Sequence, residues 1–287
     1  MRVLIDGDIL VYRAGFATEK SYYEVYPTDP SYSGSPIGVY KTKRDIPEMY
    51  KTEEYELNRA TEAEPTSFAI TVLRQMIKGI LDGVSEHTGG NVDFQMYLSG
   101  KTNFRNDVKA NHKYKGNRDN VAKPVHYAAL REALEDKYFA IVSDNKEADD
   151  DLAIAQCTLS VDTCIASIDK DLLQVAGLHY DIVKKTMTTV TEDEGLKLFY
   201  EQLLKGDAVD NIIGLKGIGL VKARKLLKDA HTEAEMFKVC NDMYNLHERE
   251  EWEIESNAQL LWLLRSEEES GKWSRPDISH LDSTDST

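Results

Sequence analysis

The chain has 287 residues, 41% of them hydrophobic, which suits one large α/β domain or one such domain with a helical extension. Its formal net charge of −15 argues against a general coat for nucleic acid, although a local concentration of positive charge could still contact nucleic acid. The three cysteines have no zinc-site spacing, the first residues are too acidic for a signal peptide, and no apolar run reaches membrane length. We therefore expect a cytoplasmic protein with reduced thiols and no membrane partner.

Short apolar runs alternate with helical patterns along the first two thirds of the chain. We expect strands at residues 2–5, 93–98, 138–142, 162–167 and 179–184, and helices at residues 9–16, 66–83, from 124 onward and 148–157. This alternation predicts an α/β fold with a doubly wound, mostly parallel sheet flanked by helices. Residues 18–65 have the character of an insertion with two hairpin strands, and the chain beyond Leu196 is expected to be entirely helical.

Four short acidic clusters lie at the ends of apolar runs. Their members are Asp6 and Asp8; Glu147, Asp149, Asp150 and Asp151; Asp169 and Asp171; and Asp207 and Asp210. A parallel sheet can gather such side chains at one edge, where so many carboxylates would repel one another without cations. Oxygen-only ligands suit Mg²⁺, with Mn²⁺ as a substitute, and two ions about 3.5–4 Å apart are the arrangement used for phosphodiester hydrolysis.

Each acidic cluster also has a simpler interpretation. Asp207 and Asp210 could form an N-cap with an acidic first turn, and Asp149 to Asp151 could be a solvated helix N-terminus. Their joint occurrence after strands that would share one sheet edge favours the metal site.

A basic segment interrupts this acidic chain. It contains Arg105, Lys109, His112, Lys113, Lys115, Arg118 and Lys123, with Tyr114 among them. Such a combination suits phosphate contact together with stacking on an unpaired base, and Lys115 and Arg118 could stabilise charge on a scissile phosphate. A solvated loop is the alternative.

A two-glycine loop, Gly217-Ile218-Gly219, precedes an amphipathic helix and has Lys216 and Lys222 beside it. Its backbone N–H groups could hold a phosphate, as in a helix-hairpin-helix element that grips duplex DNA without reading its sequence. A G-x-G pattern alone is usually only a tight turn.

Three runs of the sequence resemble the 5′ nuclease superfamily, which includes phage 5′→3′ exonucleases, flap endonucleases and the 5′ nuclease domain of bacterial DNA polymerase I. The runs are Tyr114-Lys115-Gly116-Asn117-Arg118, Glu147-Ala148-Asp149-Asp150, and residues 206–212. The resemblance implies a PIN-like catalytic domain over residues 1–190, with the insertion at 18–65 and a basic arch at 101–124. It also implies a helical region over residues 191–287 with the helix-hairpin-helix element, and it suggests a phage enzyme in the cytoplasm of an infected bacterium.

The resemblance also implies roles for individual residues. Asp6, Glu147, Asp149 and Asp150 would hold the metal nearest the attacking water, and Asp169, Asp171, Asp207 and Asp210 would hold the second metal. Nine residues would contact DNA, namely Arg105, Lys113, Tyr114, Lys115, Arg118, Lys216, Gly217, Gly219 and Lys222. The two-glycine loop could also bind K⁺.

The sequence departs from the family pattern at one position. Family members commonly carry a further metal-binding Asp just after the strand that corresponds to residues 93–98, whereas this chain has Ser99 and Gly100 there. Asp8 could compensate as a possible metal ligand, or it could simply cap the following helix.

We therefore expect a monomeric, Mg²⁺-dependent 5′→3′ exonuclease or flap endonuclease. Its substrates would be DNA with free 5′ ends, flaps or nicks, and RNA primers in RNA·DNA hybrids are a further candidate. Two alternatives are a PIN-type ribonuclease, which the helix-hairpin-helix pattern disfavours, and a catalytically impaired DNA-binding module, which the departure at Ser99 would favour.

Overall fold

A six-stranded mixed sheet organises the first compact unit of the computed structural model, which describes residues 1–118, 121–269 and 272–284. Its strand order is β6-β5-β1-β7-β8-β9. The first five strands in this order pair in parallel, and β9 pairs antiparallel with β8. The bounds are β1 (Arg2–Asp6), β5 (Asp93–Leu98), β6 (Ile141–Val142), β7 (Thr163–Ser167), β8 (Gly177–Asp181) and β9 (Thr186–Val190). The prediction of a mostly parallel α/β sheet is confirmed.

The sheet brings the carboxyl ends of its central strands together. Asp6 at the end of β1 lies level with Tyr97 of β5, and Ile5 lies level with Ala166 of β7. Helix α4 (Ala148–Thr158) packs against β1, β5 and β7. The residues that follow these strands therefore face one another at a single edge, where open α/β sheets place their ligands.

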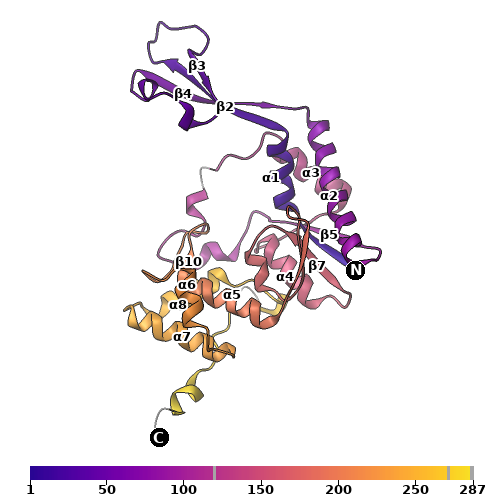
Figure 1. Cartoon of the computed structure of the whole chain (residues 1–287), viewed down its shortest axis with the longest axis vertical. Helices are drawn as coiled ribbons and strands as arrows, with labels where there is room; N and C mark the ends of the chain where they lie inside the picture. The colour runs from indigo at the N-terminus through magenta and orange to yellow at the C-terminus, as the bar shows by residue number, and fades with distance from the viewer. Residues whose placement is uncertain (119–120, 270–271, 285–287) are drawn as a thin grey trace. The chain divides into compact units, whose positions relative to one another are not determined.

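Helices make up most of the chain after the sheet, and Figure 1 shows them gathered in orange and yellow. They are α5 (Glu192–Lys205), α6 (Leu220–Leu226), α7 (Glu233–Leu246) and α8 (Glu251–Leu261), with 3₁₀ turns η6 (Glu267–Glu269) and η7 (Ser279–Thr284). Phe199, Leu203, Phe237 and Tyr244 are fully or almost fully buried in their shared core. The expectation of an entirely helical region was wrong in one place, because β10 (Gly206–Asp207) and β11 (Ile212–Ile213) form a short antiparallel pair.

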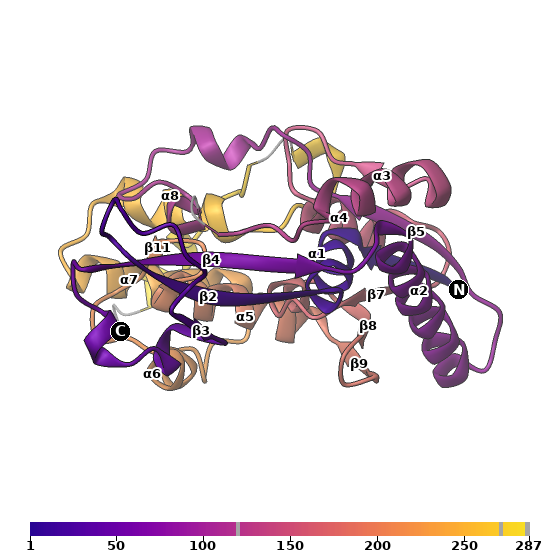
Figure 2. The same cartoon turned by 90° about the horizontal axis from the view of Figure 1, so that it is seen from above.

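The insertion forms a three-stranded antiparallel sheet, seen clearly in Figure 2. Its strands are β2 (Glu19–Pro27), β3 (Gly38–Tyr40) and β4 (Tyr55–Ala63), with turns η1 (Lys43–Asp45) and η2 (Glu48–Tyr50) between β3 and β4. The second compact unit comprises residues 10–76 and 123–133; the first comprises 1–9, 77–122 and 134–287. The functional boundary predicted at residue 190 lies inside the first unit and stays a prediction.

Three helices have some residues in each of the two units: α1 (Gly7–Ala17), α2 (Thr66–Thr88) and α3 (Tyr127–Tyr138). Tyr138 ends α3 and does not begin a strand, which corrects the expected strand at 138–142. The described part of the predicted arch, residues 101–118 and 121–124, contains only the turns η3 (Phe104–Asp107) and η4 (Gly116–Arg118), and residues 119–120 lie outside the description. None of the described helices is long and apolar enough to span a membrane.

Candidate metal and phosphate site

Ser167 joins the carboxylate that ends β1 to the carboxylate that follows β7. Its hydroxyl donates to Asp6 Oδ2 at 2.8 Å and accepts the backbone N–H of Asp169 at 3.0 Å. Asp6 Oδ1 accepts the N–H of Ile9 at 3.1 Å, so this buried carboxylate is oriented through both oxygens. Sequence reasoning missed Ser167, although a small hydroxyl residue at the last position of a buried strand is a usable signal.

Asp149 lies in the first turn of α4, directly after the N-cap residue Glu147 and Ala148. Burial raises its pKa well above the ordinary value, and the charges of Asp6, Asp169 and Glu147 raise it further. Burial likewise raises the pKa of Asp6 to about 7, against the hydrogen bonds from Ile9 and Ser167, and the charges of Asp8 and Asp169 add to the effect of burial. These carboxylates are thus close enough to repel one another, as a site for divalent cations requires.

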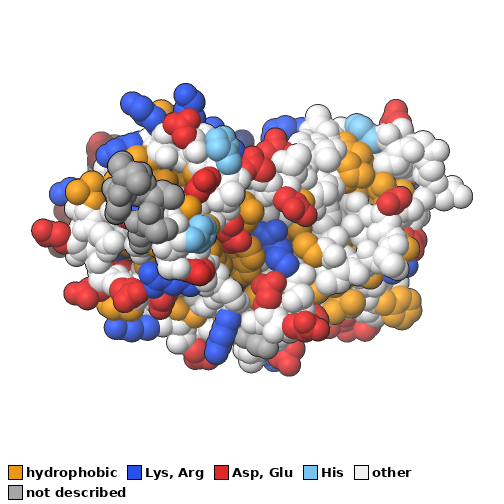
Figure 3. Space-filling model, turned by 90° about the horizontal axis from the view of Figure 1, so that it is seen from below, with side chains coloured by type: hydrophobic (Ala, Val, Ile, Leu, Met, Phe, Trp, Pro, Cys, Tyr) orange, Lys and Arg blue, Asp and Glu red, His pale blue; other side chains and the backbone are white. Residues whose placement is uncertain are grey.

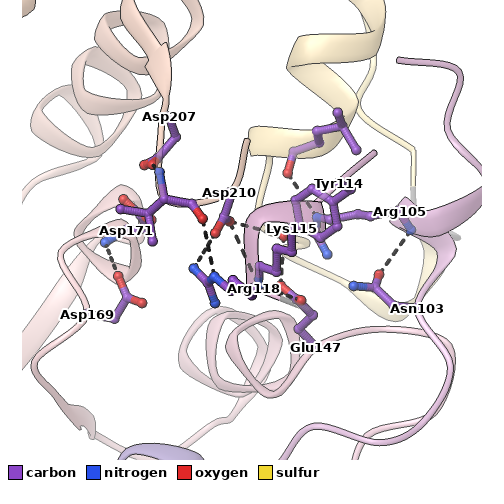
Figure 4. A network of polar contacts seen from close by, with 12 residues as sticks. Asn103, Arg105, Tyr114, Lys115, Arg118, Glu147, Asp169, Asp171, Asp207 and Asp210 are labelled. Carbon is purple, nitrogen blue, oxygen red and sulfur yellow. Dashed lines mark hydrogen bonds and ion pairs between the residues drawn. The ribbon is translucent and has the colours of Figure 1, made fainter. Parts of the chain in front are cut away.

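Asp169, Asp171 and Asp207 are each held by a hydrogen-bond donor. The backbone N–H of Asp171 donates to Asp169 Oδ1 at 2.9 Å (Figure 4), and Gln202 Nε2 donates to Asp171 Oδ1 at 2.6 Å. Lys170 Nζ lies 3.2 Å from Asp207 Oδ2 and 3.5 Å from Asp171 Oδ1. Lys170 and Gln202 are supporting residues that sequence reasoning missed. Lys170 lies inside the Asp169–Asp171 cluster, but nothing in the sequence singles out Gln202.

Lys115 and Arg118 pair with the remaining carboxylates. Lys115 Nζ lies 2.6 Å from Glu147 Oε1 and 3.8 Å from Asp210 Oδ2, while Arg118 forms an ion pair with Asp210 Oδ1. Burial lowers the pKa of Lys115, but the charges of Glu147 and Asp210 outweigh burial and leave it above its ordinary value. Figure 4 shows the two cations between Glu147 and the group formed by Asp169, Asp171 and Asp207.

The segment that carries Lys115 is fastened to the loop that carries Asp210. The hydrogen bonds that join them include Lys115 N to Asp210 O at 2.9 Å, Asn117 Nδ2 to Ala208 O at 2.8 Å, and Asn211 Nδ2 to Lys113 O at 2.9 Å. Both Lys115 and Asn211 have positive φ, at 53° and 63°, in a region that non-glycine residues seldom occupy. The two cations and Asp210 are therefore positioned as one assembly.

A buried ion pair bears on two of the predicted roles. Arg105 was expected to contact DNA and Asp150 to bind metal, but Arg105 Nη1 lies 2.6 Å from Asp150 Oδ2 and Nη2 lies 2.8 Å from Oδ1. Their side chains are 1% and 0% exposed. Asp150 also accepts the N–H of Leu264 at 3.2 Å, and Arg105 donates to the carbonyls of Leu260 and Trp262, so neither side chain is free for a ligand.

Tyr114 also differs from expectation. It was predicted to stack on an unpaired base, but its ring is 7% exposed and belongs to the core of the C-terminal helices. Its hydroxyl lies 3.0 Å from Glu147 Oε2 and 3.2 Å from Asp210 Oδ2. Tyr114 therefore contacts Glu147 and Asp210 through its hydroxyl, while most of its ring is covered.

Asp8 and Gly100 bear on the departure from the family pattern. Asp8 Oδ2 accepts the backbone N–H of Ser99 at 2.8 Å, so it joins the start of α1 to the end of β5, and its role as a metal ligand stays a prediction. A Cβ at Gly100 would lie 2.1 Å from the carbonyl oxygen of Ser143. No acidic side chain can be accommodated at position 100 without moving the backbone.

The two-glycine loop precedes α6, whose N-cap is Gly219, and Gly217 has a φ of 77° that favours glycine. Lys216 and Lys222 are exposed beside it, and their predicted DNA contacts, like those of Gly217, Gly219 and Lys113, stay predictions. The face in Figure 3 carries basic and acidic side chains interspersed, so any DNA contact there depends on local groups of cations.

The donor set suits a hard divalent cation, since its ligating atoms are carboxylate oxygens that are partly buried and mutually repelling. Within the described residues, however, no three acidic, histidine or cysteine side chains converge on a single point. Lys115, Arg118 and Lys170 supply positive charge to these carboxylates in the present arrangement. Binding of two ions would require these side chains to shift.

Solved structures with the same fold are known. A zinc-bound 5′-exonuclease of bacteriophage T5 superposes with a TM-score of 0.53 at 15% identity, covering 91% of this chain and 89% of that one. A T5 flap endonuclease in complex with DNA and metal ions gives a TM-score of 0.52 at 15% identity, covering 91% and 88%. No protein-family model matches the sequence. At this identity the likeness establishes that the chain has the 5′ nuclease fold.

Proposed function

We propose that this protein is a Mg²⁺-dependent 5′ nuclease that hydrolyses phosphodiester bonds near the 5′ ends of DNA. The observation that carries the proposal is the pairing of Lys115 and Arg118 with Glu147 and Asp210 at the carboxylate-rich sheet edge. Cations that can bind phosphate thus lie beside carboxylates that can bind metal. The likeness to a T5 flap endonuclease crystallised with DNA and metal ions supports the same substrate class.

The metal ligands in this proposal exclude Asp150. Asp6, Glu147, Asp149, Asp169, Asp171, Asp207 and Asp210 would hold two Mg²⁺ ions, with Mn²⁺ as a substitute. Bound there, the ions would lower the pKa of the attacking water and neutralise charge on the phosphate oxygens. Ser167 and Gln202 serve this chemistry by fixing the orientations of Asp6 and Asp171.

Lys115 and Arg118 hold the scissile phosphate in this proposal. Lys and Arg side chains donate charge-assisted hydrogen bonds to phosphate as well as to carboxylate, so a phosphodiester can replace the carboxylates as their acceptor. Because the segment is fastened to the Asp210 loop, the exchange would leave the two cations aligned with the metal ligands. They would then stabilise the extra negative charge that develops on the phosphate during hydrolysis.

We propose that duplex phosphates away from the reacting bond are bound by Lys216, Gly217, Gly219 and Lys222, and that K⁺ binds at the same loop. Lys222 is exposed on α6. Replacing it, Lys222→Ala, should weaken DNA binding and reduce the slope of log affinity against log salt by about one unit. Cleavage at saturating enzyme should change little, because this contact is remote from the chemistry. An unchanged salt slope would contradict the assignment.

A panel of labelled substrates tests the function. The substrates are a 5′ flap, a nicked duplex, a blunt duplex and an RNA-primed duplex, each incubated with Mg²⁺, Mn²⁺ or EDTA. Cleavage near the 5′ end should occur with either metal and stop in EDTA. A ribonuclease of the PIN type would instead cut single-stranded RNA and ignore the DNA flap, and a DNA-binding module would bind the panel without cleaving it. Either result would overturn the proposal.

A further inference from the structure

A cavity of ≈ 200 Å³ lies beside Glu147, on the side of the site where β5 ends. The turn from Ser99 to Asn103 forms one wall, and Asn106, Tyr114, Lys115 and Lys146 form the rest. The cavity shares Lys115 and Glu147 with the proposed cleavage site, so a group bound in it would be a direct neighbour of the scissile phosphate.

The charge of the cavity wall is positive, in contrast to the rest of the chain. Lys101, Lys115 and Lys146 line it, with Glu147 as the one carboxylate among its lining residues. Lys115 and Lys146 already have carboxylate partners, at Glu147 and at Asp151 and Glu267. Lys101 forms no ion pair or hydrogen bond with any described side chain, so its charge is available for an anion.

Two amide side chains add hydrogen-bond donors to the same wall. Asn103 Oδ1 accepts the backbone N–H of Arg105 at 3.0 Å, which leaves its NH₂ group without an acceptor among the described residues (Figure 4). The side chain of Asn106 likewise has no partner within the described chain. An anion with several oxygen atoms could therefore receive hydrogen bonds from Lys101 and from both amides.

Gly100 keeps a second carboxylate out of the lining of this cavity. A side chain at position 100 would collide with the carbonyl oxygen of Ser143, at 2.1 Å from the Cβ, so the tight turn admits only glycine. The position at which a further acidic ligand was expected is thus occupied by a turn that presents Lys101. The turn therefore contributes a lysine to the lining of the cavity and no carboxylate.

We propose that this cavity binds the 5′-terminal phosphate of the substrate strand, with Lys101, Asn103 and Asn106 as its ligands. The inference rests on the proposed function, because Lys115 would hold the adjacent scissile phosphodiester. A phosphate monoester carries a charge of about −1.5 to −2 at neutral pH and has several acceptor oxygens, whereas a 5′-hydroxyl carries no charge. The volume is sufficient for one phosphate group and part of its sugar but leaves no room for a base pair. The enzyme would accordingly prefer 5′-phosphorylated ends.

Binding in EDTA, where cleavage cannot occur, tests this inference without relying on activity. One fluorescent strand is prepared with a 5′-phosphate and with a 5′-hydroxyl, and its affinity is measured by anisotropy for the wild type, Lys101→Ala and Asn106→Ala. Lys184→Ala is the matched control, since Lys184 is an exposed lysine that pairs with Asp181 in the β8–β9 turn. The wild type and Lys184→Ala should bind the phosphorylated strand about tenfold more tightly than the hydroxyl strand.

The preference should fall to less than about threefold in Lys101→Ala and decrease in Asn106→Ala, because each change removes a contact to the phosphate alone. Equal affinities of the wild type for both strands would overturn the inference. So would a Lys101→Ala protein that loses affinity equally for both, since Lys101 would then be a general DNA contact. If the preference depends on Lys101 but no substrate is cleaved with Mg²⁺ or Mn²⁺, the phosphate site stands and the proposed nuclease function fails.

Discussion

Two sets of ion pairs are formed by the same basic segment, and they differ in burial. The Arg105–Asp150 pair is 1% and 0% exposed and is saturated with hydrogen bonds. The pairs of Lys115 with Glu147 and of Arg118 with Asp210 lie at the open edge of the sheet, where their side chains are 16–44% exposed. A ligand can displace a partner in the open pairs without leaving a charge buried, but not in the buried pair.

This difference in burial assigns neighbouring residues to different roles, one in the stability of the fold and one in the proposed chemistry. Asp149 and Asp150 are neighbours on α4, yet burial and nearby like charges raise the pKa of Asp149, while Arg105 outweighs burial and lowers the pKa of Asp150. A carboxylate such as Asp150, whose pKa is lowered and whose oxygens already accept hydrogen bonds, stabilises the fold. A carboxylate repelled by its neighbours is stabilised by an added cation.

The largest effect is expected from removing charge at the open carboxylates. Asp171→Asn should reduce single-turnover cleavage with Mg²⁺ at least about 10³-fold, because the second metal loses a charged ligand. DNA binding should stay intact or improve, since a negative charge facing phosphate is removed. Asp93→Asn is the control, because Asp93 is an exposed residue at the start of β5. A near-wild-type rate for Asp171→Asn would remove Asp171 from the ligand set.

Breaking the buried pair should act on folding. Arg105→Ala leaves Asp150 without its partner in a site closed to water, so the free energy of unfolding should fall by about 3–5 kcal/mol. Urea denaturation followed by circular dichroism measures this loss. A loss below about 1 kcal/mol, comparable to that of an exposed ion pair, would mean that Arg105 is not structurally buried in solution.

Breaking the open pair should act on rate. Lys115→Ala should lower the single-turnover rate by about 10²-fold, the scale of one lost electrostatic contact to the transition state. Its free energy of unfolding should change far less than that of Arg105→Ala, because Lys115 remains partly exposed and its loss leaves accessible carboxylates. Equal losses of stability in the two variants would erase the distinction between the two kinds of pair.

The pKa of Asp6 predicts how pH and metal affect the fold. Burial raises its folded-state pKa to about 7 from 3.8, so the folded protein holds this proton more tightly than the unfolded chain does. In EDTA the melting temperature should therefore fall as pH rises from about 4 to about 7, and Mg²⁺ should restore several degrees above pH 7. A metal-free melting temperature that rises across this range would contradict the burial of Asp6.

The sheet and its acidic edge could be predicted because they depend on local patterns. Apolar runs ending in carboxylates specify which residues follow each strand, and the parallel pairing of β1, β5 and β7 then brings them together. The antiparallel strand β9 and the third strand of the insertion were missed, since their residues are largely exposed and lack an apolar pattern.

The roles of Arg105, Tyr114 and Asp150 could not be read from the sequence, because each depends on burial by distant segments. The carbonyls of Leu260 and Trp262 reach Arg105 across more than one hundred and fifty residues of chain. A basic residue in a basic segment resembles a DNA contact until the C-terminal segment that covers it is known. The roles of Ser167 and Gln202 could not be predicted for the same reason, because each depends on a carboxylate that only the fold brings close.

The neighbouring carboxylates of α4 give the most direct test of the whole account. Asp149→Asn and Asp150→Asn are compared for cleavage of a 5′-flap substrate at increasing Mg²⁺, at a temperature where circular dichroism shows both proteins folded. Asp149→Asn should stay folded and lose at least about 10³-fold in rate, whereas Asp150→Asn should melt at lower temperature and, while folded, keep a Mg²⁺ activation curve close to that of the wild type. If Asp150→Asn instead loses activity through weakened Mg²⁺ binding while Asp149→Asn remains active, the assignment of metal ligand and scaffold is reversed and the account fails.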